Sequence, residues 1–252
     1  MSAYDIRSGE KIAQADISYL FGGRAGNLIC ELNWSPNSNF VSFNSGCDLG
    51  TERTLKEVYV WQLATGDVKR ITNFTVDILK DERVPMVAAR YKTWWLDNDT
   101  LLIGGAAWID PSGPESNFTA KYVLRDATLH LISQVGSAQW AVNPVSGKVA
   151  YVTAETFDIS ESLSADSKVI VSTIVADTLS PERAFKGGCK AVWSLDGKQL
   201  VVLTYTTLSC LAGLKSIIFI DPDTGSQHYH EIALDRDVLT DFAQPVGWVR
   251  VS

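Results

Sequence analysis

Histidine and serine are the residues of this chain that an enzyme would be most expected to use. A serine hydrolase of the α/β type needs a Gly-x-Ser-x-Gly elbow to expose its hydroxyl, and a histidine base within reach. The chain has 3 histidines and no such elbow. His228 and His230 flank Tyr229, a spacing that places two imidazoles on one face of a strand. No third ligand accompanies them, so we expect an exposed outer strand and no bound metal.

Two other segments have only a superficial likeness to ligand-binding motifs. Asp221-Pro222-Asp223-Thr224-Gly225 begins like a calcium loop, but the pattern of oxygen ligands ending in a bidentate glutamate does not follow. The glycine-rich run at residues 21–26 matches neither the P-loop nor the dinucleotide fingerprint, and it precedes a strand. We therefore expect no cofactor, no catalytic residue and no enzymatic activity.

The four cysteines stand at comparable places in two parts of the chain. Cys30 and Cys189 each precede a tryptophan by four residues, while Cys47 and Cys210 follow the next strand in each case. A disulfide within each part is one interpretation. The other is that Cys30 and Cys189 are buried as small apolar residues. Both interpretations remain open, and zinc-type Cys-x-x-Cys spacing is absent.

Composition and charge exclude several classes of partner. The chain has 252 residues, 46% of them hydrophobic, with 22 Lys+Arg against 29 Asp+Glu and a net charge of −7. The positive charges are scattered singly, so a nucleic acid is not an expected partner. The chain has no run of 18 consecutive apolar residues, so we expect no membrane-spanning helix. The N-terminus has no basic and apolar leader pattern, so we expect a cytoplasmic location.

Short strands must position whatever site the chain has. Apolar residues at helical period are not sustained, whereas β-branched and aromatic runs recur between turn residues. Such runs cover residues 40–43, 58–61, 149–152, 169–172, 200–203 and 217–220. The sequence predicts an all-β protein.

Tryptophan marks an internal repeat. Trp34 and Trp193 open segments that align without a gap, Trp94 fits the same frame, and Trp140 fits with two extra residues. Trp248 begins a fifth copy, and the markers stand 60, 46, 53 and 55 residues apart. This spacing is typical of one four-stranded propeller blade per repeat. Each tryptophan is expected to end the first strand of a hairpin and to anchor it between neighbouring blades.

A second repeated signal is a glycine turn between two strands. It occurs around Gly66 after the strand 58–63, around Gly225 after the strand 217–220, and around Gly9 at the N-terminus. We interpret these turns as joining the third and outermost strands of a blade. The chain would then start in the second half of a blade and end in the first half of one.

The hairpins at Trp34–Asn37 and Trp193–Lys198, with the turns at Thr65–Asp67 and Thr224–Ser226, resemble the repeats of TolB-like and WD-repeat-like β-propellers. They also resemble the propeller domains of prolyl-oligopeptidase-family serine peptidases. The His and Trp-Asp signatures of true WD repeats are absent, because Trp61-Gln62 occupies the corresponding place. The resemblance implies a propeller scaffold rather than a particular activity.

The predicted organisation is a single propeller domain over residues 1–252. Four complete blades cover residues 20–75, 76–134, 135–186 and 187–234. A fifth, incomplete closing blade combines residues 235–252 with residues 1–18. Shared termini are a usual way for a propeller to close. Two alternatives are a fragment of a longer propeller and completion of the open edge by another chain.

The candidate binding residues lie on predicted rim loops at 44–56, 104–120, 153–166 and 204–215. Trp108 and Phe118 either anchor a partner or pack their loop onto its blade. Further candidates around a channel mouth are Arg24, Arg53, Arg90, Lys190 and Tyr205.

These features favour a non-catalytic propeller that acts as a protein–protein interaction scaffold or assembly subunit. Its partner would be another protein or subunit, bound through the rim loops or the open blade edge. Two alternatives are a substrate-gating propeller fragment of a prolyl-oligopeptidase-like peptidase and a propeller that binds a small ligand.

Overall fold

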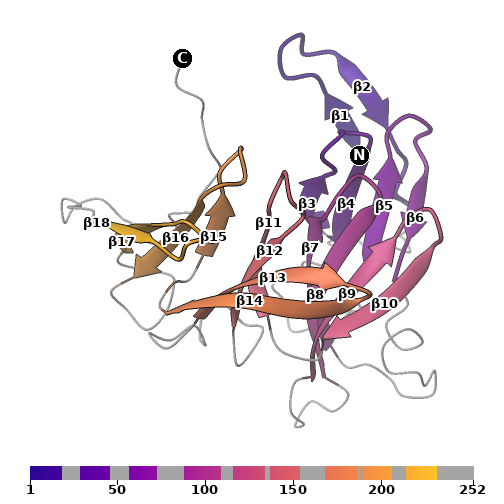
Figure 1. Ribbon diagram of the computed structural model, residues 1–252. Helices are drawn as coiled ribbons and strands as arrows, with labels where there is room; N and C mark the ends of the chain where they lie inside the picture. The colour runs from indigo at the N-terminus through magenta and orange to yellow at the C-terminus, as the bar shows by residue number, and fades with distance from the viewer. Residues whose placement is uncertain are drawn as a thin grey trace. The chain divides into compact units, whose positions relative to one another are not determined.

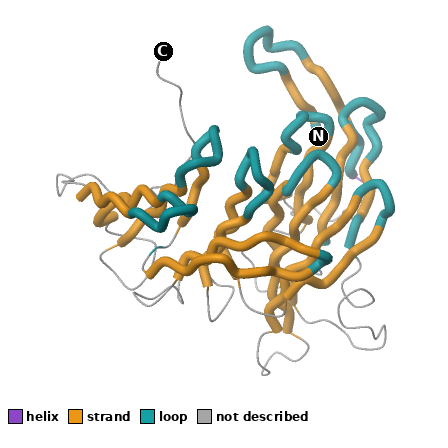
Figure 2. The backbone as a smooth tube through the Cα atoms, viewed as in Figure 1, coloured by secondary structure: helices purple, strands orange, loops and turns teal. Residues whose placement is uncertain are grey.

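Eighteen β-strands make up the secondary structure of the described residues. The computed structural model describes residues 1–18, 29–45, 57–72, 88–108, 116–133, 137–153, 168–186, 188, 190–205 and 214–231. Figure 2 shows strands joined by turns and loops in this part of the chain. No helix among the described residues is both long and apolar enough to span a membrane.

The strands form four antiparallel sheets of four strands and one two-stranded hairpin, labelled in Figure 1. The N-terminal hairpin consists of β1 (Ser2–Tyr4) and β2 (Lys11–Gln14). Sheet 1 consists of β3 (Ile29–Trp34), β4 (Phe40–Ser45), β5 (Val58–Gln62) and β6 (Val68–Arg70). Sheet 2 consists of β7 (Ala88–Trp95), β8 (Thr100–Trp108), β9 (Ser116–Val123) and β10 (Thr128–Ser133).

Sheet 3 consists of β11 (Ser137–Val142), β12 (Val149–Thr153), β13 (Lys168–Val175) and β14 (Thr178–Lys186). Sheet 4 consists of β15 (Lys190–Trp193), β16 (Leu200–Tyr205), β17 (Leu214–Ile220) and β18 (Gln227–Glu231). In every sheet the spatial order of the strands follows the chain. The predictions of an all-β fold and of one four-stranded sheet per repeat are confirmed.

Each of the four predicted blade ranges contains one of these sheets. The chain divides into two compact units, Met1–Ser116 with Ala120–Leu131, and Asn117–Thr119 with Ile132–Ser252. Residues 235–252 of the predicted closing blade, including Trp248, lie outside the described residues. Closure within one domain therefore stays a prediction.

Two buried clusters hold neighbouring elements together. One joins the N-terminal hairpin to sheet 1, where Ala3 packs with Phe43, Tyr59 and Trp61. The other joins sheets 3 and 4, with members that include Val169 and Val202. Burial of alternating apolar residues from adjoining sheets supplies the main stabilisation of such a stack.

One backbone hydrogen bond closes the turn between the first and second strands of every sheet. Its donors are the amides of Ser35, Leu96, Asn143 and Ser194, and its acceptors are the carbonyls of Phe40, Thr100, Lys148 and Gln199. The residues before the donors therefore occupy one equivalent place, which we call the hairpin position. They are Trp34, Trp95, Val142 and Trp193.

The hairpin position confirms the alignment of Trp34 with Trp193 and corrects the other two markers. Trp95, not Trp94, is the equivalent residue in sheet 2. Trp140 lies two residues before the equivalent Val142, which accounts for its two extra residues. It is 4% exposed, and its ring stacks on Tyr151 at a centroid distance of 4.6 Å.

Two of the tryptophans at the hairpin position tie neighbouring sheets together. The Trp95 indole N–H donates to the Asn33 carbonyl at 2.9 Å, and the Trp193 indole donates to the Ala141 carbonyl at 3.1 Å. Both acceptors directly precede the hairpin position of the previous sheet. Trp95 and Trp193 are 7% and 4% exposed, whereas Trp34 is 48% exposed. The predicted anchoring role is confirmed for Trp193, and in sheet 2 Trp95 has the role that was predicted for Trp94.

We expect Trp193→Phe to lower the free energy of unfolding by about 1 kcal/mol, because a partly buried carbonyl loses its donor. Trp95→Phe should behave alike, and the exposed Trp34→Phe should change stability by less than about 0.5 kcal/mol. Urea unfolding followed by circular dichroism measures all three. Equal losses from the three variants would contradict an anchoring role for the indole N–H.

The predicted glycine turns all adopt one geometry. Gly9, Gly66 and Gly225 have φ of 73°, 78° and 81°, which only glycine adopts without strain. Each amide donates to the carbonyl four residues earlier, at 2.8, 3.0 and 2.8 Å respectively. The turns join β1 to β2, β5 to β6 and β17 to β18, so the prediction of strand pairs linked by a glycine turn is confirmed.

Candidate functional site

Most of the binding residues predicted from the sequence remain untested. Arg24 and Arg53 lie outside the described residues. Arg90 lies in β7, Trp108 ends β8, and Tyr205 ends β16. Lys190 is half-buried at the start of β15. Convergence of these residues at a channel mouth stays a prediction.

The predicted loop at residues 104–120 is shorter than expected. Residues 104–108 of the predicted loop belong to strand β8. Each of them pairs with a residue of β7, from Gly104 opposite Lys92 to Trp108 opposite Ala88. Strand β9 begins at Ser116, and Phe118 within it is 4% exposed. Phe118 therefore packs inside the protein, the second of its two interpretations. Residues 46–56, 154–167 and 206–213 of the other predicted loops lie outside the described residues.

The segment at Asp221 is a turn, as expected. The Asp221 carboxylate accepts the backbone amides of Asp223 at 2.9 Å and Thr224 at 3.1 Å. The Thr224 amide, as the largest cause, lowers the pKa of Asp221 below its usual value. A carboxylate committed to its own backbone is typical of an Asx turn.

His228 and His230 lie on the exposed strand β18, and His230 meets the Phe219 ring edge-on at a centroid distance of 5.3 Å. Within the described residues, no group of three His, Cys, Asp or Glu side chains could hold a metal ion. Cys47, Cys189 and Cys210 lie outside those residues, so both interpretations of the cysteines stay predictions.

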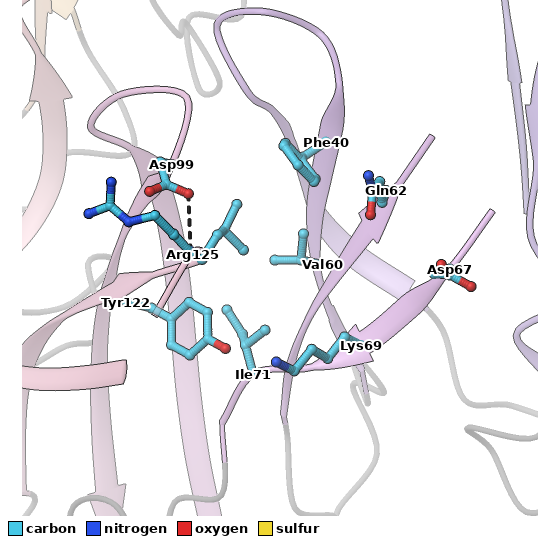
Figure 3. A pocket seen from close by; sticks show the side chains of 10 residues that line it. Phe40, Val60, Gln62, Asp67, Lys69, Ile71, Asp99, Tyr122 and Arg125 are labelled. Carbon is cyan, nitrogen blue, oxygen red and sulfur yellow. Dashed lines mark hydrogen bonds between the residues drawn. The ribbon is translucent and has the colours of Figure 1, made fainter. Parts of the chain in front are cut away.

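A surface pocket that the sequence did not predict lies between strands of sheets 1 and 2 (Figure 3). We call it the sheet 1–2 pocket. It has a volume of about 390 Å³. The residues that line it are Phe40, Val60, Gln62, Asp67, Lys69, Ile71, Asp99, Tyr122, Leu124 and Arg125.

Strand register explains why sheet 1 presents both apolar and charged groups to the pocket. Val60 on β5 stands opposite Lys69 on β6, so the two side chains share one face of the sheet. Phe40 begins β4 and stacks on Trp95 of β7 at a centroid distance of 6.1 Å. The remaining wall comes from the turn after β9, which the Leu124 amide ties to the Asp99 carbonyl at 2.8 Å.

Four polar side chains of the pocket, Gln62 and Asp67 at its edge and Lys69 and Tyr122 beside its floor, have no partner among the described residues. Among the described residues, neither the Lys69 amine nor the Tyr122 hydroxyl has a hydrogen-bond or ion-pair partner. Figure 3 shows the two groups pointing toward one another beside Ile71. Tyr122 and Ile71 are 3% and 6% exposed, so they form the floor of the pocket. Sequence analysis missed this site because its walls come from two different repeats.

Arg125 and Asp99 interact at one rim of the pocket. The Arg125 backbone amide donates to the Asp99 carboxylate at 3.1 Å, and the Arg125 guanidinium pairs with Asp126 at 3.3 Å. The hydrogen bond that Arg125 donates to Asp126 is the main cause that raises the pKa of Arg125, and the charges of Asp126 and Asp99 add to it. Arg125 is thus a permanent cation whose charge is partly satisfied by the chain itself.

The corresponding place in the other compact unit, between sheets 3 and 4, holds ion pairs; we call it the sheet 3–4 junction. Lys148 lies 2.8 Å from the Glu182 carboxylate and 3.5 Å from the Asp223 carboxylate. Hydrogen bonds from Lys148 first and from Thr173 second lower the pKa of Glu182. The hydrogen bond to Glu182 raises the pKa of Lys148.

Because folding lowers the Glu182 pKa, the pair stabilises the fold above the ordinary glutamate pKa, and this contribution is lost as the pH falls through the folded value. We therefore expect Lys148→Met to be about 0.5 kcal/mol less stable than the wild type at neutral pH, since exposed pairs are screened. The difference should disappear in acid. Urea midpoints of the wild type and of Lys148→Met, measured from neutral to acid pH, test this expectation. A difference in stability that stays constant with pH would show that the ion pair does not cause it.

The comparisons with known proteins identify the fold. No family model matches this chain, and no curated protein matches its sequence. Oligogalacturonate lyase in complex with manganese matches with a TM-score of 0.60 and 9% identity, over 90% of this chain and 58% of that one. A puromycin-hydrolyzing peptidase from Mycobacterium tuberculosis matches with a TM-score of 0.53 and 13% identity, over 83% and 30%.

TolB from Acinetobacter baumannii is a further match, with a TM-score of 0.49 and 15% identity over 81% of this chain and 44% of that one. This chain spans less than two thirds of the length of each of these structures. At such identities the likeness concerns the fold alone. The matches to the lyase and the peptidase, together with the four sheets, show a β-propeller fold, as the repeat predicted.

Proposed function

We propose that this β-propeller is a non-catalytic protein-binding module and that the sheet 1–2 pocket is one docking point for its partner. The observation that carries the proposal is the pair of unpartnered polar groups, Lys69 and Tyr122, on an otherwise apolar floor. A polar group that faces a concave apolar surface fixes the orientation of whatever binds there.

The pocket also has the layout of an interface centre. Ile71 and Tyr122 are buried at its floor, while Gln62 and Asp67 are exposed at its edge. Protein interfaces commonly have an apolar centre that receives an anchoring side chain and a polar rim around it. Strands of sheet 1 and a hydrogen-bonded turn of sheet 2 hold the walls, so little entropy is lost when a partner binds.

Site-specific crosslinking tests the proposal. A benzoylphenylalanine placed at Gln62, on the pocket rim, is expected to capture one protein from an extract of the source cells. The same residue at Tyr229 serves as the control, because Tyr229 is an aromatic residue of β18 that is 62% exposed. Identical capture patterns from the two sites would contradict docking at the pocket.

Capture alone does not support the proposal, so the captured protein must then be purified. It should bind the wild-type chain and lose at least fivefold in affinity on Lys69→Gln. Arg70→Gln is the matched control, because Arg70 is the next residue of the same exposed strand and its side chain points to the other face. Equal losses of affinity from both variants would mean that the net charge of the chain, and not Lys69 in the pocket, determines binding, and this would contradict the proposal.

The two alternatives from the sequence stay predictions. A captured partner that carries an α/β-hydrolase domain would favour a substrate-gating role. A pocket that binds small molecules while Gln62 captures no protein would favour a small-ligand propeller.

A further inference from the structure

The two sheet junctions described above are equivalent by register, which allows a comparison within this one chain. Val60 pairs with Lys69 in sheet 1, and Val171 pairs with Arg183 in sheet 3. The two valines occupy equivalent places in their sheets. Val60 stands opposite Ser42, which is eight residues after Trp34 at the hairpin position. Val171 stands opposite Ala150, which is eight residues after Val142 at the hairpin position. Lys69 and Arg183 are therefore equivalent cations.

In the sheet 3–4 junction, the chain itself satisfies the equivalent cation. Arg183 donates to the Asp223 carbonyl, which belongs to the turn between β17 and β18 of the next sheet. Lys148 pairs with Glu182 and Asp223 in the same place. A backbone carbonyl thus accepts from Arg183, and two carboxylates pair with Lys148.

The sheet 1–2 pocket has the opposite arrangement. The turn between β9 and β10 carries Arg125 there, and in Figure 3 its guanidinium, which pairs with Asp126, points away from the Lys69 amine. The place equivalent to Lys148 is taken by Phe40, since both residues accept the backbone bond that closes their hairpin. Lys69 consequently has no acceptor from the described chain, and a cavity of about 390 Å³ remains beside it.

The acidic residues of the pocket do not replace the missing acceptor. Asp99 accepts the Arg125 amide at 3.1 Å and faces that rim. Asp67 lies at the end of the pocket away from the Lys69 amine in Figure 3. The Lys69 amine and Tyr122 hydroxyl are therefore the groups available to a ligand beside Ile71, whereas Gln62 and Asp67 are exposed at the edge. An ammonium beside a hydroxyl donor is suited to a carboxylate.

The surrounding wall requires an apolar group next to that carboxylate. Phe40, Val60 and Leu124 contribute apolar side chains to the lining, and Ile71 lies between the two polar groups. Burial of an apolar group against them supplies affinity, while the charged contact supplies orientation.

From this internal comparison we propose that the sheet 1–2 pocket binds an acidic side chain flanked by an apolar residue in a segment of the partner protein. The inference rests on the proposed function and names the chemistry of the partner. The partner's carboxylate takes the place that the chain's own acceptors occupy in the sheet 3–4 junction.

Paired peptides test the inference directly. The acetylated, amidated peptide Ala-Phe-Glu-Ala and its Gln counterpart have the same shape and differ in the carboxylate alone. Titrations followed by NMR of the ¹⁵N-labelled chain suit the weak affinity of one subsite. The Glu peptide is expected to bind at least fivefold more tightly than the Gln peptide, and the preference should shrink as salt is raised.

Variants locate the effect. Lys69→Met keeps the length of the side chain and should abolish the preference for Glu, whereas Arg70→Gln should leave it unchanged. Tyr122→Phe keeps the buried ring and should reduce the preference about twofold. A circular dichroism spectrum of each variant separates loss of binding from loss of folding.

Three outcomes would overturn the inference: equal binding of the two peptides, tighter binding of a Lys peptide, or an equal loss from Lys69→Met and Arg70→Gln. Binding of phenylacetate without the Glu peptide would assign the pocket to free acids instead. A protein captured from Gln62 together with equal peptide binding would leave the proposed function standing and reject only the carboxylate.

Discussion

Replacing Gly188 by alanine is expected to lower the free energy of unfolding by about 3 kcal/mol, the sum of backbone strain and overpacking. Gly188 has a φ of +139°, and an added Cβ would lie 2.3 Å from the Val202 Cγ1 and 3.1 Å from the Val169 Cγ2. Both valines are 0% exposed members of the core that joins sheets 3 and 4. Neither can move away without disturbing its neighbours.

Gly147→Ala is the matched control for this substitution. Gly147 also has a positive φ, +68°, but an added Cβ would meet nothing within 4 Å. Strain alone remains, so we expect a loss of about 1 kcal/mol. Urea unfolding of both variants followed by circular dichroism gives the comparison. A loss for Gly188→Ala no larger than that for Gly147→Ala would show that the core around Val202 yields to the extra methyl.

Thr72→Val is expected to cost about 2–4 kcal/mol, because it removes a hydroxyl that serves two buried groups. The Thr72 Oγ1 accepts the Val58 amide at 2.9 Å and donates to the Glu57 carboxylate. Thr72 and Glu57 are 6% and 7% exposed, and Val58 is 0% exposed. Valine has nearly the same shape as threonine, so the loss measures the hydrogen bonds rather than a cavity.

Thr72→Ser keeps the hydroxyl and removes one methyl, so it should cost only about 1 kcal/mol. Urea midpoints of the two variants, measured at one pH, decide between the two contributions. If Thr72→Ser were as destabilising as Thr72→Val, loss of the methyl group would account for the loss of stability. The hydrogen bonds of the Thr72 hydroxyl with Val58 and Glu57 would then contribute little to the free energy of unfolding.

Local patterns account for the parts of the fold that were predictable. Val58, Tyr59, Val60 and Trp61 form a continuous run of β-branched and aromatic residues, and such a run needs only neighbouring residues to be recognised. The turns at Gly66 and Gly225 were predictable for the same reason, since a positive φ selects glycine at a single place. The four sheets follow from repeating this local unit.

The misplaced markers and the missed site depend on longer-range facts. Trp94 and Trp95 differ in which one donates to the Asn33 carbonyl of another sheet, and no pattern within residues 88–108 distinguishes them. Trp140 was displaced by a register shift between Ala138 and Ala141. Strand β8 continues to Trp108 because β7 provides a partner as far as Ala88, and this pairing was not recognisable from residues 104–108 alone.

The strands, the turns, the repeat and hence the propeller fold were predictable from local sequence, because each depends on runs of side chains and on the backbone preferences of single residues. The packed sheets were needed to show that Lys69 and Arg125 line one pocket, whereas Arg183, the cation equivalent to Lys69, donates to a backbone carbonyl of the next sheet. Those residues come from different repeats, so their encounter depends on how neighbouring sheets pack. An unsatisfied charge is a property of that packing and not of either strand alone.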